Sequence, residues 1–470
     1  MTGTPDPVQG RGRIGRLLDR ATRSAVVRSL GVLVGGTALA HGITAAAMPF
    51  ATRIFTPQDF AAASAFSSLV GIFVVASCLR YELAIPLPDE DEEAANLLAL
   101  SAISVVGTAG LTAVVLALLP QTALAALGQP SLIPHLWLLP VALLIGGLYL
   151  ALQMWFVRKK GFGPIARSRI VQSAAATVGQ LGLGVLGFAP LGLLVGQMLN
   201  YGAGAATLGA GVLVRERAIL SRVTWSGIAR AARIHHRFPR YSIGESLANA
   251  AAIHLPILLI AALAAGPEAG YLALAIFLLQ APMALVGTAV GQVYLSGAPE
   301  ALRERRLAAF TDDMLGRLIQ ISAGPILLLA LVSPALFGLV FGEAWTRSGV
   351  LVAWMAPWFF FQFVSSPIST VLHVTGRQGW AMVLQVAGLV LRVGAVVGFA
   401  WIDSTRVVEA YAISGLVFYL AYLLVALRAA GIGVTSLLKR GRSAAPGILI
   451  ALFLAAAAHA VLMLARAPAG

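Results

Sequence analysis

The chain has 470 residues, of which 59% are hydrophobic and 11% are charged, and its mean hydropathy is +0.87. Soluble domains carry about 25% charged residues, so this composition excludes a soluble globular protein. The net charge of +14 would indicate nucleic-acid binding in a soluble protein, but here membrane topology and anionic lipid headgroups explain it. The single cysteine, Cys78, excludes a disulfide framework and a cysteine metal site.

Thirteen apolar stretches are long enough to cross a bilayer, which takes about 20 helical residues. We therefore expect an all-α polytopic membrane protein with 12–14 transmembrane helices, in two six-helix lobes around a central cavity. The predicted spans are 30–52, 60–79, 95–119, 132–156, 168–187, 190–213, 246–265, 269–295, 318–341, 350–372, 380–401, 408–430 and 446–465.

Lysine and arginine residues fall almost entirely in alternate gaps between these spans. With the N-terminus in the cytoplasm, the inner gaps hold 28 of the 33 basic residues. The outer gaps hold four, which are Arg53, Arg347, Arg406 and Arg466, and Arg392 lies inside a span. The positive-inside rule therefore predicts a multi-pass membrane protein with a cytoplasmic N-terminus.

The spans divide the chain into five parts. A basic cytoplasmic segment (1–29) precedes an N-lobe of six helices (30–214), a cytoplasmic amphipathic linker (215–241) and a C-lobe of six helices (242–430). A cytoplasmic loop and an extra transmembrane helix follow (431–470). Residues 170–214 carry no charge and would make a helix twice too long for a bilayer. We expect them to fold back at Gly187-Phe188-Ala189-Pro190.

Two helix openings suggest that the lobes are repeats. Thr56 can cap the second span, with Pro57 in its first turn and Asp59 three residues after the cap. Gly266-Pro267-Glu268 opens the eighth span similarly, 210 residues later. Six spans separate the two openings, which predicts a parallel repeat with a cavity between lobes. The alternative is that short outer loops converge on proline and acidic residues by chance.

The linker has apolar residues roughly on one helical face, at Ile219, Val223, Ile228 and Ala232. Its arginines lie elsewhere, which is typical of an amphipathic helix on the inner membrane surface. A solvated linker is the alternative.

No soluble-enzyme signature is present. The chain has no GxxxxGK[ST] phosphate loop, no HExxH and no GxSxG. We therefore expect neither an enzyme nor an ATP-driven pump, and no catalytic residue, metal site or bound cofactor.

Three segments carry a family resemblance. These are RIFTPQDF (53–60), LRYELAIPLP (79–88) and the stretch from FPRYSIGES through HLPILL to GQVY (238–294). Over residues 27–300 the chain resembles the polysaccharide transporters of the multidrug/oligosaccharidyl-lipid/polysaccharide exporter superfamily, the O-antigen and exopolysaccharide repeat-unit flippases. Relatives usually carry 12 or 14 spans, so the count of thirteen departs from the pattern.

The resemblance implies a cargo of oligosaccharide on undecaprenyl pyrophosphate, flipped between the leaflets of the bacterial inner membrane by alternating access. Because arginine matches phosphate oxygens with a planar fork, arginines near cavity mouths are the candidate pyrophosphate ligands. Arg28, Arg80 and Arg240 lie at the inner boundary, where the positive-inside rule alone also predicts arginine. Arg53 is outside, where the alternatives are contact with lipid headgroups or a pair with Asp59. Arg392 lies at mid-span, where a charge costs at least ~2.5 kcal/mol, so it should face a cavity or make an interhelix contact.

Gating or coupling could involve three further residues. Glu82 follows Arg80 by two residues and could cap a helix or form a gate at the inner mouth. His41 and His254 could take up protons, although an intramembrane histidine is more often a packed hydrogen-bond donor. Uncharged residues that could contact sugars or bond neighbouring helices are Gln180, Gln197, Gln280, Gln362 and Gln385.

Two other functions compete with the flippase. One is a cation-coupled multidrug exporter, which should carry an acidic residue at mid-depth; Glu245 lies at a span end. The other is a scaffold that recruits glycan-assembly enzymes. The flippase predicts lipid-linked oligosaccharide and membrane lipids as partners, with a glycan polymerase and glycosyltransferases as further candidates and no nucleic acid. A proton gradient, a sodium gradient or downhill removal of product could drive it.

Overall fold

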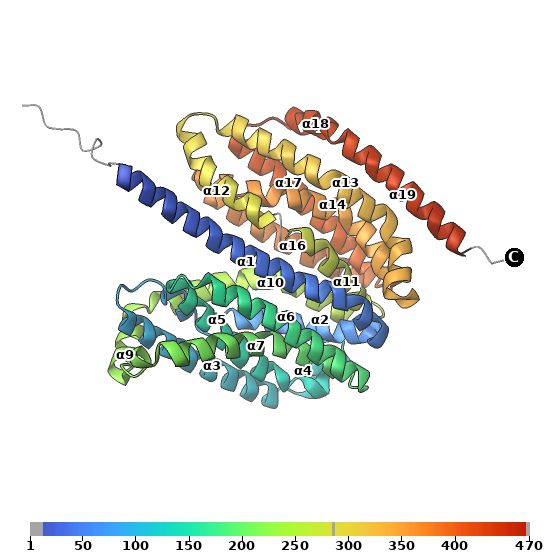
Figure 1. Ribbon diagram of the computed structural model, residues 1–470. Coiled ribbons are helices and arrows are strands. Elements are labelled where there is room, and N and C mark those ends of the chain that lie inside the picture. The colour runs from blue at the N-terminus through green and yellow to red at the C-terminus, as the bar shows by residue number, and fades with distance from the viewer. Residues whose placement is uncertain (1–12, 284–286, 467–470) are drawn as a thin grey trace, which may run out of the picture.

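The computed structural model describes residues 13–283 and 287–466, and within these ranges it is helical with no strand. The helices form two bundles that lie one above the other in Figure 1, joined by a linker. The N-lobe comprises α1 (Arg13–Ile54), α2 (Pro57–Val74), η1 (Tyr81–Ala84), α3 (Asp91–Leu118), α4 (Gln121–Ala125), η2 (Pro130–His135), α5 (Leu138–Arg158), α6 (Phe162–Val185) and α7 (Leu191–Arg215).

The linker contains α8 (Arg217–Leu220), α9 (Trp225–Ile234) and η3 (Phe238–Ser242). The C-lobe comprises α10 (Ile243–Leu263), α11 (Glu268–Pro282), α12 (Thr288–Arg303), α13 (Leu307–Phe341), η5 (Glu343–Trp345), α14 (Thr346–Ile368), α15 (Val371–Val374), α16 (Gln378–Ile402) and α17 (Val407–Ala430). The chain continues with α18 (Val434–Ser443) and α19 (Ala445–Arg466).

Eight of the described helices have the length and hydropathy of membrane spans, or nine if the bent pair α18–α19 counts as one. The all-helical, multi-span prediction is therefore confirmed, whereas the count of thirteen is not. The extra helix α19 packs on α13, where Gly324 and Gly447 let the two backbones approach closely.

Local signals in the sequence set several helix ends. Thr56 accepts a hydrogen bond from the Asp59 amide, and the Asp59 carboxylate accepts one from the Thr56 amide, so the predicted capping box begins α2. The predicted fold-back is also present, because α6 ends at Val185, Gly187 adopts a φ of +85°, and α7 returns along α6.

Two predicted elements are broken within the described residues, the second span and the linker helix. The second span ends at Val74, before Leu79 and Arg80 take positive φ values. The eighth span begins as α11, which reaches Pro282, and α12 begins at Thr288; residues 284–286 between them lie outside the described residues. The single linker helix is split into α8 and α9 because extended Thr224 caps α9 and donates its amide to Asn96.

Among the residues whose burial the structure describes, the lobes share a core at one end of the molecule. We call this the closed end, where α1 ends and α2 begins, and the opposite end, where α9 lies, the linker end. Buried residues of both lobes form one cluster at the closed end, including Ala51, Phe66, Leu272 and Trp345. Two further clusters of buried residues lie apart from it. One consists of N-lobe residues and Ala231 of α9, and the other consists of C-lobe residues and Ala444, between α18 and α19. The lobes are thus packed together toward the closed end and have separate cores toward the linker end.

Candidate functional site

A cavity of about 360 Å³ lies between the lobes. Helices α1, α2, α6 and α7 line it from the N-lobe, and α11 lines it from the C-lobe. Its polar lining is uncharged throughout: Thr44, Ser64, Ser67, Thr177, Gln180, Gln197 and Asn200. Phe60 and Phe277 add aromatic surface, one from each lobe.

The α6–α7 hairpin presents the amide side chains to this cavity. A Cβ at Gly196 would lie 2.8 Å from the Gln180 Cβ, so the glycine gives Gln180 room to lie against α7. Ser67 donates a hydrogen bond from α2 to Gln197 Oε1. Amide and hydroxyl groups both donate and accept hydrogen bonds, which suits a ligand rich in hydroxyl groups.

At the closed end, α1 and α2 contact the C-lobe through their termini. Trp345 donates its indole N–H to the Thr52 carbonyl at 2.9 Å, and its ring packs edge-on against Phe60. Arg53 donates to the carbonyls of Pro49 at 2.8 Å and Val340 at 2.9 Å. Arg53 thus joins the lobes, while Asp59, the alternative partner, is engaged by Thr56.

The two helix openings that suggested a repeat lie against each other at this end. Gly270, in the first turn of α11, meets the backbone of Pro57, in the first turn of α2. A Cβ at Gly270 would lie only 1.9 Å from the Pro57 carbonyl oxygen. Glycine is therefore required for the helices to approach this closely.

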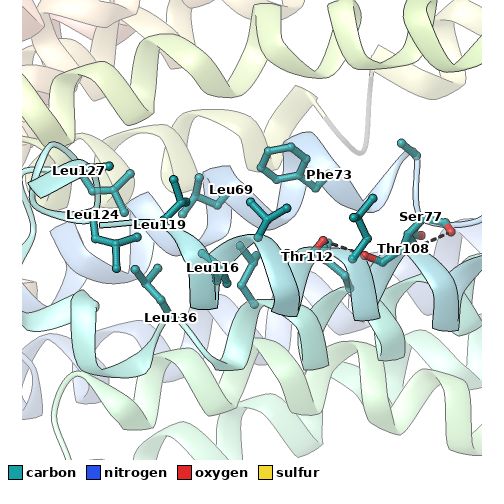
Figure 2. A pocket seen from close by; sticks show the side chains of 16 residues that line it. Leu69, Phe73, Ser77, Thr108, Thr112, Leu116, Leu119, Leu124, Leu127 and Leu136 are labelled. Atoms are coloured by element: carbon teal, nitrogen blue, oxygen red, sulfur yellow. Dashed lines mark hydrogen bonds between the residues drawn. The ribbon is translucent and has the colours of Figure 1, made fainter. Parts of the chain in front are cut away.

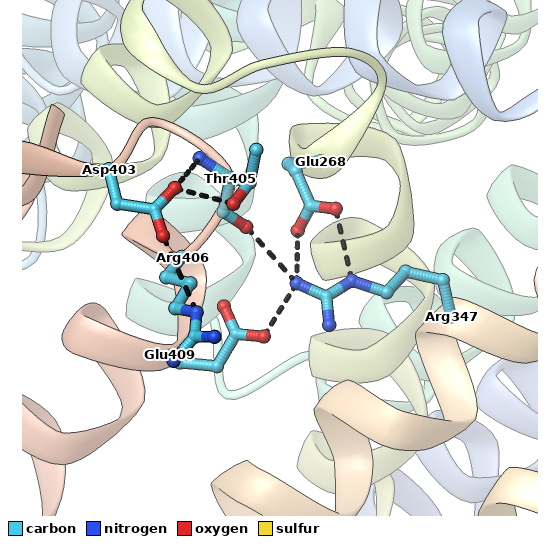
Figure 3. A network of polar contacts seen from close by, with 6 residues as sticks. All are labelled: Glu268, Arg347, Asp403, Thr405, Arg406 and Glu409. Carbon is cyan, nitrogen blue, oxygen red and sulfur yellow. Dashed lines mark hydrogen bonds and ion pairs between the residues drawn. The ribbon is translucent and has the colours of Figure 1, made fainter.

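A polar network behind this contact holds three C-lobe helices together (Figure 3). Arg347 of α14 donates to both carboxylate oxygens of Glu268 on α11, at 3.0 and 3.1 Å, and pairs with Glu409 on α17 at 2.7 Å. The carboxylates are nearly buried, with side-chain exposures of 9% for Glu268 and 13% for Glu409. The segment Gly266-Pro267-Glu268 opens this helix as predicted, since α11 begins at Glu268, one residue before the predicted span, and Glu268 anchors the helix through Arg347.

At the linker end, Arg80 and Glu82 form an ion pair. Side chains two residues apart on a regular helix would not face each other, so the pair depends on the local backbone. Arg80 has a φ of +64° and begins the short helix η1, which places its guanidinium 3.1 Å from Glu82 Oε1. Glu82 lies in the connection between α2 and α3 and is 2% exposed. Burial raises the pKa of the Glu82 carboxyl, although a backbone hydrogen bond and Arg80 partly oppose this shift.

The raised pKa of Glu82 predicts a pH effect on stability. Between the unfolded value of about 4.3 and the raised folded value, the folded state holds more protons than the unfolded state. The free energy of unfolding should therefore fall as pH rises through this window, and Glu82→Gln should remove that part of the fall. Thermal unfolding in detergent across a pH series measures it. A slope for Glu82→Gln equal to that of the wild type would refute the prediction.

The remaining predicted arginines are distributed along the molecule. Arg240 is exposed in η3, over the Tyr241 ring, and η3 neighbours η1. Arg392 is 6% exposed within the C-lobe; its Nε donates to the Gly388 carbonyl, and its guanidinium lies 4.8 Å from the Phe418 ring centre. These are contacts within α16 and with α17. The side chain of Arg28 lies outside the described residues.

The two histidines occupy different environments. His41 is exposed on α1. His254, on α10, packs against Gly71 of α2, where a Cβ would lie 2.4 Å from the imidazole Nε2. His254 thus sits at the lobe interface. Cargo binding by the five arginines and gating by Glu82, His41 and His254 stay predictions.

Sequence reasoning left several cavity and closed-end residues without a role. The sequence indicates only that Gln180 and Gln197 could contact sugars or neighbouring helices. It does not single out Ser64, Ser67 or Asn200. One signal could have found them: the lining residues of α6 (176, 177, 180) and α7 (193, 196, 197, 200) recur at helical spacing. Arg347 was counted only as an outer charge, because its partners lie far away in sequence.

Comparison with known proteins gives the family and the fold. The family model described as "Polysaccharide biosynthesis protein" matches residues 50–349, more than half of the chain. No curated protein sequence matches.

Solved structures share the fold at low identity. The lipid II flippase MurJ in an inward closed conformation superposes with a TM-score of 0.67 at 12% identity, covering 93% of this chain and 98% of that chain. A multidrug resistance MATE family transporter of the MOP superfamily, in an inward-facing conformation, gives 0.57 at 14% identity, covering 86% and 98%. A mutant of the Vibrio cholerae MATE transporter VcmN gives 0.53 at 14% identity, covering 86% and 97%. The chain therefore belongs to the polysaccharide biosynthesis protein family and has the multi-span fold of the MOP superfamily flippases and transporters.

Proposed function

We propose that this protein is a flippase that translocates undecaprenyl-pyrophosphate-linked oligosaccharide repeat units across the bacterial inner membrane by alternating access, for surface polysaccharide biosynthesis. The observation that carries the proposal is the cavity between the lobes. Its lining offers amide and hydroxyl groups with two aromatic side chains and no charge. Such a lining suits the hydroxyl groups and apolar faces of sugars.

The distribution of charge supports an orientation. The linker end holds the arginines of α9 and η3 and the basic residues of α18, whereas the closed end holds Arg53, Arg347 and Arg406. By the positive-inside rule the linker end is cytoplasmic. Because the lobes have separate cores toward that end, the cavity would receive cargo from the cytoplasmic leaflet.

The arginines provide a route for the pyrophosphate. Arg240 and Arg80 lie in adjacent elements at the linker end, and Arg53 lies at the closed end. A doubly or triply charged headgroup could pass from the first pair to Arg53 as the lobes exchange closure. Arg28 and Arg392 are further candidates, and a proton or sodium gradient could drive the cycle.

Leucine substitutions at two cavity amides test the proposal. Gln180→Leu with Gln197→Leu keeps the side-chain volume similar and removes two hydrogen-bonding groups. We expect the flipping rate of a polyprenyl-diphosphate oligosaccharide in proteoliposomes to fall roughly thirtyfold, from two hydrogen bonds of about 1 kcal/mol each. Gln385→Leu, at an exposed glutamine on α16, is the matched control and should flip normally. An unchanged rate in the double variant would remove the cavity from the mechanism.

A cation-coupled multidrug exporter is the second candidate, because MATE transporters share the fold. The lining argues against it, since a cationic drug would find no counter-ion among these residues. Drug efflux from the same proteoliposomes, without glycan flipping, would favour the exporter. A scaffold for a glycan polymerase and glycosyltransferases would show neither activity.

A further inference from the structure

A second cavity, which is apolar, forms a groove in the N-lobe (Figure 2). It measures about 450 Å³ and is lined by α2, α3, α4 and the start of α5. Leu139 and Leu143, both nearly buried, lie on its inner side, whereas Phe73 and Val115 are almost half exposed at its rim. Its α3 wall runs from Thr108 to Leu119, which corresponds to about 16 Å along a helix axis. We call it the N-lobe groove.

The three hydroxyl groups along the groove already have partners. Ser77 donates to the Val74 carbonyl at 2.7 Å, and Thr108 donates to the Ser77 carbonyl at 2.9 Å. Thr112 donates to the Thr108 carbonyl at 2.9 Å, as the dashed lines in Figure 2 show. The hydroxyl protons are therefore engaged within the protein, and the groove offers a ligand mainly hydrocarbon surface.

The groove adjoins a contact between the lobes. The α4–η2 connection that closes one end contacts the C-lobe helix α10: Gln129 donates to the Ala261 carbonyl at 2.7 Å, and Gly128 meets the Ala262 backbone. At the other end, Arg80 follows Ser77 by three residues, and its buried Nε has no hydrogen-bond partner among the described residues. The groove is complementary to a long hydrocarbon chain, and near its end Arg80, which pairs with Glu82 through Nη1, keeps that Nε–H for an anionic headgroup.

We propose that the N-lobe groove holds part of the polyprenyl chain of the lipid-linked cargo, with the diphosphate toward Arg80. This inference rests on the proposed function. A chain seated here would stay in the membrane phase beside α2, the helix that forms the lobe interface, while the glycan enters the cavity between the lobes. The groove would thus hold the hydrocarbon chain apart from the polar site.

A photoreactive polyprenyl diphosphate with a diazirine on its chain tests this in nanodiscs of the full-length protein. We expect labelled peptides from residues 69–77 or 108–127, with labelling suppressed by unlabelled polyprenyl diphosphate and not by phosphatidylglycerol. Val115→Trp fills the groove and should lower the labelling about tenfold, as expected when roughly two methylene groups lose an apolar site. Val114→Trp is the control, because Val114 is exposed on the same helix but does not line the groove.

Three results would overturn the inference: labelling only elsewhere, equal suppression by phosphatidylglycerol, or full labelling of Val115→Trp. Equal suppression would identify the occupant as bilayer lipid. The flipping assay distinguishes failure of the groove proposal from failure of the flippase proposal. If the wild type flips cargo without labelling the groove, only the groove proposal fails; if it labels the groove without flipping, only the flippase proposal fails.

Discussion

Gly270→Val should open the closed end. A Cβ at this position would lie 1.9 Å from the Pro57 carbonyl oxygen, 2.9 Å from its carbon and 3.0 Å from the Ala61 nitrogen. All three are backbone atoms that cannot rotate away, so α11 and α2 must separate. Overpacking of this kind costs about 1–3 kcal/mol, and 1.4 kcal/mol already shifts a two-state equilibrium about tenfold.

Thiol labelling measures this opening. In a Cys78→Ala background, a cysteine at Ala51, which is 0% exposed within the closed-end core, reports access to a membrane-impermeant reagent. We expect Gly270→Val to raise its labelling rate about tenfold or more, following the shift in population. Gly107→Val is the control, since a Cβ at Gly107 meets nothing within 4 Å. A labelling rate equal to that of the control would contradict the tight contact between α2 and α11.

Arg347→Gln should destabilise the protein by about 3 kcal/mol or more, because it leaves the carboxylates of Glu268 and Glu409 nearly buried without their cation. The network joins α11, α14 and α17; α11 carries the closed-end contact of Gly270, and α14 begins directly after Trp345. We therefore expect both a lower melting temperature in detergent and faster labelling at the Ala51 position.

Two comparison variants make the Arg347 prediction specific. Arg406→Gln breaks an exposed pair with Asp403 nearby, and such a pair contributes little to stability because water and salt screen it. A triple variant that also carries Glu268→Gln and Glu409→Gln removes the uncompensated charge and should recover much of the loss. If Arg347→Gln and Arg406→Gln melt alike, the network does not hold these helices together.

Local sequence signals predicted local structure well. The Thr56 cap, the start of α11 at Glu268 and the Gly187–Pro190 fold-back each depend on residues within one helical turn, and all are present. The apolar stretches predicted most of the long helices, because the length and hydropathy of a span are properties of one continuous segment. The burial of Arg392 followed from its mid-span position, although the sequence left open whether a cavity or another helix surrounds it.

Features that depend on packing between distant segments could not be predicted from the sequence. Arg347 lies 79 residues from Glu268, and nothing in either segment indicates that the two helix ends converge. Arg80 meets Glu82 because Leu79 and Arg80 take positive φ values, which non-glycine residues rarely do. The helical spacing of the polar residues on α6 and α7 marks one face of each helix, but the sequence does not indicate that these faces meet α2 and α11.

Distances across the two ends test the central claim, that the lobes exchange closure around an uncharged glycan cavity. Spin labels at the exposed Phe50 and Leu339 span the closed end, and labels at Leu213 and Arg306 span the linker end. In proteoliposomes, polyprenyl-diphosphate oligosaccharide should lengthen the first distance and shorten the second, whereas a cationic drug should change neither. If cargo is flipped while both distances stay fixed, or if the drug alone moves them, the account is wrong.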